Sequence, residues 1–197
     1  MITDKASFLT LQADGVTVSQ TFTATAGTTN QIDLGNARID LGTGEKLRVV
    51  FSIPAAPTSG AADTFFTNVT FAVRGSATSN MASAVVLGSS RAYTQAELIG
   101  ATTVAVNAAS PANGGPGYPS VVVEIDPTAF SGSALLNPGS QANLQDGTAA
   151  LQPRYLDGHV TLTSPQGALS LPIAAVLVTE HGQNYPHRAF ITGITRV

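Results

Sequence analysis

Hydrophobic and polar residues alternate along several stretches of this chain, with the period of two that marks a half-buried β-strand. The clearest stretch is residues 47–53, where the odd-numbered positions are apolar and most even-numbered ones are polar. Residues 65–73, 121–125 and 156–162 show the same alternation. Because successive side chains of a strand point to opposite faces, each stretch predicts a strand with one face against a core.

Further stretches have a weaker strand pattern, and many of them end at Gly, Asn, Asp or Pro. They are residues 8–12, 16–23, 31–34, 84–87, 102–106, 169–178 and 188–195. Asp14-Gly15 lies between the first two and is a strong turn signal, because Gly accepts the positive φ that tight hairpin turns need. We therefore expect residues 8–23 to form one hairpin.

Helix signals are confined to one short segment. Thr94 and Glu97 have the spacing of a capping box, and Gly100 is placed to end the helix after barely two turns. Many short strands with Gly and Pro turns, and at most one short helix, predict an all-β jelly-roll or β-sandwich of antiparallel strands. We expect one domain over residues 1–197, with a flexible N-terminal arm at 1–7 and a Gly/Pro-rich insertion at 107–153.

The composition indicates a protein that works inside an assembly. Charged residues make up 11% of the chain, well below the roughly 25% of ordinary soluble domains. Weakly charged surfaces associate readily because little self-repulsion opposes docking. The net charge is -3 and the nine Lys and Arg residues are scattered singly, so no basic stripe is available to neutralise a run of phosphates. We expect no nucleic-acid partner.

The chain contains no cysteine, which removes disulfides and thiolate chemistry and fits synthesis in a reducing cytoplasm. Residues 1–5 lack the basic-then-apolar pattern of a secretory signal. The longest apolar run, residues 171–178, contains Pro172 and is too short to span a bilayer. We expect a protein made without processing and without a membrane partner.

Three histidines, His159, His181 and His187, have Asp157 and Glu180 nearby and resemble the ingredients of a divalent metal site. Their spacing matches no known ligand pattern. Asp157 and His159 alternate with apolar neighbours, so we expect both side chains to face outward. His181 and His187 are therefore weak metal candidates. We favour the interpretation that these histidines lie on a solvated surface or at a subunit contact, and we expect no cofactor.

Catalytic patterns are missing from the sequence. No window matches G-x-S-x-G, and the four glutamates are too dispersed to suggest a paired-carboxylate site. We therefore expect no catalytic residues and no enzyme. Sugar binding stays open, because tyrosines can stack on sugar rings, although Trp is absent and tyrosines near loops also serve at interfaces. The tyrosines are Tyr93, Tyr118, Tyr155 and Tyr185.

Several short segments, taken in their order along the chain, carry a resemblance to a known family. They are Met1-Ile2-Thr3-Asp4-Lys5 with Phe8-Leu9, Ile32-Asp33-Leu34-Gly35, residues 47–53, Phe71-Ala72-Val73-Arg74-Gly75-Ser76, residues 84–90 with Tyr93-Thr94 and Glu97-Leu98, Arg154-Tyr155-Leu156, and Leu177-Val178-Thr179. Together they resemble the jelly-roll capsid cement, or decoration, proteins of tailed bacteriophages. The resemblance covers residues 1 to about 106 and 154 to 197, and the insertion at 107–153 departs from it.

The resemblance implies a structural virion protein on the exterior of the capsid, where it clamps neighbouring major capsid subunits and has no catalytic residues. We expect the major capsid protein as partner, together with further copies of this chain in a dimer or trimer. The alternatives are another virion module, of a tail or fibre, and a carbohydrate-binding β-sandwich. Our interface candidates are Met1, Ile2, Asp4, Lys5, Tyr118, Pro119, Tyr185 and His187.

Overall fold

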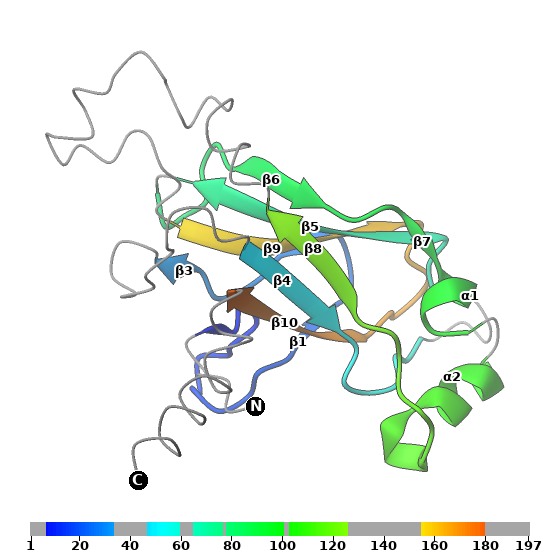
Figure 1. Cartoon of the computed structure of the whole chain (residues 1–197). Coiled ribbons are helices and arrows are strands. Elements are labelled where there is room, and N and C mark those ends of the chain that lie inside the picture. The colour runs from blue at the N-terminus through cyan, green and yellow to red at the C-terminus, as the bar shows by residue number, and fades with distance from the viewer. Residues whose placement is uncertain are drawn as a thin grey trace, which may run out of the picture.

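The computed structural model describes residues 7–33, 47–59, 65–76, 78–100, 103–125 and 155–179. Two antiparallel sheets pack against each other in these residues (Figure 1). The strands are β1 (Gln20–Phe22), β2 (Ala26–Gly27), β3 (Ile32–Asp33), β4 (Leu47–Ser52), β5 (Asn68–Ser76), β6 (Val85–Ser89), β7 (Tyr93–Thr94), β8 (Val121–Ile125), β9 (Tyr155–Thr163) and β10 (Leu171–Thr179). The helices are α1 (Gln95–Leu98), α2 (Thr103–Ala109) and the 3-10 turn η2 (Pro111–Asn113).

The strand order is that of a jelly roll. One sheet has the order β1-β10-β4-β8, and the other has the order β2-β9-β5-β6, with β3 beside β9 and β7 beside β5. Because β2 and β3 share one edge of β9, and β6 and β7 share one edge of β5, each pair acts as a single broken strand. The chain then alternates between the sheets as a double Greek key does, which confirms the predicted all-β jelly-roll class.

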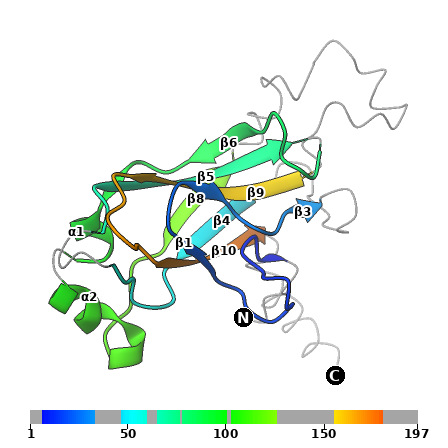
Figure 2. The ribbon, with the colours of Figure 1, turned by 180° about the vertical axis from the view of Figure 1, so that it is seen from behind.

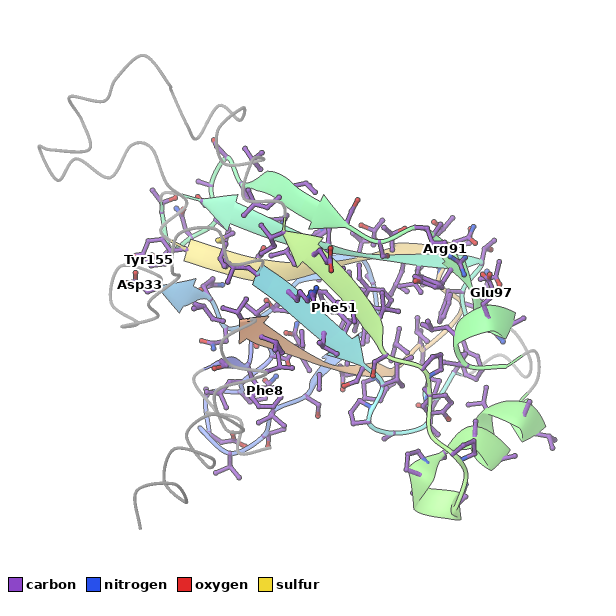
Figure 3. The ribbon with its side chains drawn as sticks, viewed as in Figure 1. Phe8, Asp33, Phe51, Arg91, Glu97 and Tyr155 are labelled. Atoms are coloured by element: carbon purple, nitrogen blue, oxygen red, sulfur yellow. The ribbon has the colours of Figure 1, made fainter. Side chains whose placement is uncertain are left out.

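The core lies between the two sheets and is built from the alternating strands. In β4 the buried side chains are Leu47, Val49 and Phe51, as the period of two predicts. Phe51 lies on β4 (Figure 3), and its ring meets the ring of Phe71 from β5 with centroids 5.0 Å apart. This contact joins the two sheets, because β4 and β5 belong to different ones.

The predicted hairpin at residues 8–23 is wrong, although its turn is present. Gly15 has φ 64° and donates its N–H to the carbonyl of Gln12 at 2.9 Å. The segment before the turn pairs elsewhere, because Phe8 bridges to Val176 and the Leu9 N–H donates to the Ala175 carbonyl at 2.8 Å. Across the turn the Gln12 N–H still donates to the Thr17 carbonyl at 2.8 Å, but the edge of β10 takes the hydrogen bonds of residues 8 and 9, so no two-stranded hairpin forms.

The strand predicted at 102–106 is also wrong, since residues from Thr103 form helix α2. The β-branched residues at its start favour a strand locally, but three alanines in Thr103–Ala109 are strong helix formers. Val106 is buried while Val104 is exposed, which fits a helix and not a strand, because residues two apart lie on opposite sides of a helix but on the same face of a strand. The structure thus has a second short helix where we expected at most one.

The predicted first helix is confirmed but is shorter than expected. In α1 the Thr94 N–H donates to the Glu97 carboxylate at 2.8 Å, and the Glu97 N–H donates to the Thr94 hydroxyl at 3.4 Å, which completes the capping box. The side chain of Gln95 accepts the N–H of Phe65 at 2.6 Å. Phe65 and Phe66 are both buried ahead of β5, so the predicted alternation begins only at Asn68.

Three predictions lie outside the described residues. They are most of the N-terminal arm (1–6), the strand at 188–195 and the second part of the insertion (126–153).

Candidate functional site

The connections that the structure describes between strands gather at the two ends of the sandwich. At the end that carries α1 and α2 lie the turns from β1 to β2, β4 to β5, β7 to β8 and β9 to β10, whereas the β5–β6 turn lies at the opposite end (Figures 1 and 2). We call the first of these the α2 end. Its described residues are 23–25, 53–59, 65–67, 90–100, 103–120 and 164–170.

The α2 end is almost free of charge. Arg91 and Glu97 are the charged residues within its described part, and they pair with each other at 2.9 Å (Figure 3). The guanidinium of Arg91 also lies over the ring of Tyr93, 4.1 Å from its centroid. The pKa of Glu97 is lowered, first by the backbone N–H and hydroxyl of Thr94 and then by Arg91. No unpaired charge is therefore left on the described surface of this end.

A lobe of residues 103–119 stands at this end and contains no charged residue. We call it the α2 lobe, and it comprises α2, η2 and the following Gly/Pro segment. Val104 is 78% exposed, more than any other large apolar residue in the described chain. The remaining exposed apolar residues of the lobe are Ala105, Ala108, Pro111, Ala112, Pro116 and Pro119.

Internal hydrogen bonds hold the α2 lobe in one conformation. The N–H of Gly115 donates to the Ser110 carbonyl, and that of Gly117 donates to the Ala109 carbonyl, both at 3.0 Å. A Cβ on Gly115 would lie 2.0 Å from the Ala108 carbonyl oxygen, so only glycine fits at this position. The closely packed backbone makes the lobe a formed surface.

Tyr118 and Pro119, two of the predicted interface residues, end the lobe with different roles. The ring of Tyr118 packs against the core and its hydroxyl donates to the Val106 carbonyl. Burial raises the pKa of Tyr118. Pro119 is exposed and available for contact. The other predicted interface residues, Met1, Ile2, Asp4, Lys5, Tyr185 and His187, lie outside the described residues.

An ion pair lies on the outer face of the six-stranded sheet, the face to which we expected Asp157 to point. Arg74 of β5 faces Asp157 of β9 in register and binds both of its carboxylate oxygens, one through Nε at 3.0 Å and the other through Nη2. The predicted outward direction of Asp157 is confirmed, but the side chain is only 1% exposed, so it does not lie on a solvated surface. β9 is an inner strand, and a Cβ on Gly27 of neighbouring β2 would lie within 2.8 Å of both partners.

His159 is also less solvated than expected. It follows Asp157 on the same face of β9 and is only partly exposed, and its Nδ1 is buried with no hydrogen-bond partner. Burial lowers the pKa of His159, and the nearby Arg74 lowers it further, while Asp157 acts in the opposite sense. The described residues contain no group of three His, Cys, Asp or Glu side chains that could hold a metal ion. His181 and His187 lie outside them.

The outer face of the four-stranded sheet carries an apolar row that the sequence analysis missed. Phe8 pairs with Val176, which pairs with Val50, which in turn pairs with Val122. Opposed residues of neighbouring strands share a face, so the four side chains form one line across the sheet. The next pair on the same face, two residues along the strands, is Arg48 and Glu124, which form an ion pair at 2.9 Å. One residue of the sequence could have indicated this row. Val50 is apolar at an even-numbered position of β4, where the alternation predicts a polar side chain.

These features define a class of protein: an all-β jelly roll that presents formed, weakly charged surfaces. No helix in the described part of the chain combines the length and apolar character that crossing a membrane requires.

The family model Bbp16 matches residues 16–115, just over half of the chain. The chain therefore belongs to the Bbp16 family. The matched segment extends from the turn before β1 into the α2 lobe. No curated protein matches the chain.

Proposed function

We propose that this protein is a capsid cement, or decoration, protein of a tailed bacteriophage, which binds the outside of the head and clamps neighbouring major capsid subunits. The observation that carries the proposal is a rigid jelly roll in which each arginine of the described residues is paired with a carboxylate. The described residues contain three arginines and no lysine, and each arginine is in an ion pair, Arg48 with Glu124, Arg74 with Asp157 and Arg91 with Glu97. Such a surface docks on protein with little electrostatic cost.

The ordered resemblance of the sequence to phage cement proteins supports the same role. A rigid module that bridges the seams of an expanded shell adds buried area and stabilises the shell by mass action. Because many copies bind one shell, each contact can be weak. We further propose that the chain acts as a dimer or trimer, is made in the host cytoplasm and has no catalytic activity.

The proposal is tested by co-sedimentation of the purified protein with undecorated, expanded capsids of its phage. Binding is expected to saturate at a copy number that matches the symmetry of the shell. Isolated tails and unexpanded heads serve as controls. Saturable binding to tails, or no binding to any part of the virion, would refute the proposed function.

A further inference from the structure

We infer that the α2 lobe, residues 103–119, is the part of this protein that docks on the shell, and that it fits an uncharged, apolar patch on a major capsid subunit. The inference rests on the proposed function and names the surface and the chemistry of its partner. Three properties of the lobe carry it: its exposed apolar residues, its lack of charge and its fixed conformation.

The exposure of the lobe is unusual for this chain. Four large apolar residues in the described chain are at least half exposed: Val16, Val86, Val104 and Val122. Val104 is the most exposed of them, and the lobe adds alanines and prolines on the same segment. Exposed apolar side chains that gather on one segment are typical of a protein-binding surface, whereas single ones are ordinary.

The lack of charge on the lobe indicates that the partner surface is also uncharged. From Leu98 to Val123 the sequence contains no charged residue, and the charges nearest in sequence at this end, Arg91 and Glu97, satisfy each other. A charged partner surface would lose its hydration on contact and would find no opposite charge here. A neutral apolar patch of a protein loses little hydration and gains buried area.

The fixed conformation lowers the cost of docking. Hydrogen bonds of Gly115, Gly117 and Tyr118 already hold the segment, and prolines restrict its backbone further. A preorganised segment loses little conformational entropy when it binds. A contact area too small for tight binding of one copy is then sufficient on a shell that offers many sites.

The test uses matched valine substitutions in the full chain and expanded capsids that lack the protein. Val104→Lys and Val104→Glu place either charge on the lobe, Val16→Lys is the control away from it, and Val122→Lys probes the outer face of the four-stranded sheet. Both Val104 variants are expected to bind about tenfold more weakly or worse, because a charge is buried without a partner. Val16→Lys is expected to bind like the wild type.

Further measurements separate the possible failures. Because Val104 is exposed, the thermal midpoints of its variants should equal that of the wild type, which excludes misfolding as the cause of weak binding. Wild-type binding should change little with added salt, since no charged groups meet. If the wild type binds no capsid, the proposed function fails. If the wild type binds and Val104 variants bind equally well, or only Val122→Lys loses binding, the inference about the lobe is overturned while the proposed function stands.

Discussion

Arg74 and Asp157 lie directly opposite each other on β5 and β9, and the guanidinium binds both oxygens of a carboxylate that is only 1% exposed. The pair links the two central strands of the six-stranded sheet on its outer face. Because Arg74 is the only ion-pair partner found for this carboxylate among the described residues, the two residues act as a unit.

Replacing Arg74 alone should therefore be costly. We expect Arg74→Met to lower the free energy of unfolding by about 3 kcal/mol, because it leaves a buried carboxylate without its cation. Urea unfolding at neutral pH measures the change. Arg48→Met is the matched control: it breaks the exposed pair with Glu124 and should cost less than about 1 kcal/mol. Equal losses for the two variants would show that burial of Asp157 is not what makes the pair important.

Gly88 controls how closely the two sheets approach at their β6–β8 edge. A Cβ on this residue would lie 2.3 Å from the backbone oxygen of Glu124. We expect Gly88→Ala to destabilise the protein by about 2 kcal/mol, because β6 must move away from β8. Thermal or urea unfolding measures the loss, and Val86→Ala on the exposed face of the same strand is the control. A fully stable Gly88→Ala variant would mean that this edge is loosely packed.

His159 should make the stability depend on pH. Its pKa is lower in the folded protein than in the unfolded chain, so the unfolded chain takes up the proton first as the pH falls. The stabilisation is complete above the unfolded-state pKa of about 6.5. It is lost as the pH falls from there through the folded-state value.

The variant His159→Gln removes this titration and leaves the other two histidines in place. Its free energy of unfolding, measured by urea at pH 7.5 and at pH 5.5, should fall less between the two conditions than that of the wild type. If both proteins lose the same stability, burial of Nδ1 does not shift the titration of His159, and the pH dependence arises elsewhere.

Tyr118 should hold the α2 lobe to the sandwich through the hydrogen bond from its hydroxyl to the Val106 carbonyl. We expect Tyr118→Phe to lower the free energy of unfolding by about 1 kcal/mol, since only the hydroxyl is lost. The amide protons of Gly115 and Gly117 should exchange faster in this variant, measured by hydrogen exchange. Unchanged exchange would show that the backbone hydrogen bonds hold the lobe without the tyrosine.

Local patterns in the sequence were enough to predict much of the fold. Alternation located β4 and β8 and placed Asp157 and His159 on the same outward face of β9. The spacing of Thr94 and Glu97 located α1, because a capping box needs only residues that are close in the chain. The low content of charge is likewise a property of composition and needs no structure.

Contacts between distant segments decided the rest. Whether the outward face of β9 meets water depends on β5 and β2, which bring Arg74 and Gly27 to Asp157 from far along the chain. The row from Phe8 to Val122 exists only through the order in which four segments pair. The period of two assigns a side chain to a face of its strand, but only the neighbouring strands determine what covers that face. For this reason the sequence by itself located the longer strands, the first helix and the weak charge, while the tertiary structure decided the buried ion pair, the apolar row and the α2 lobe.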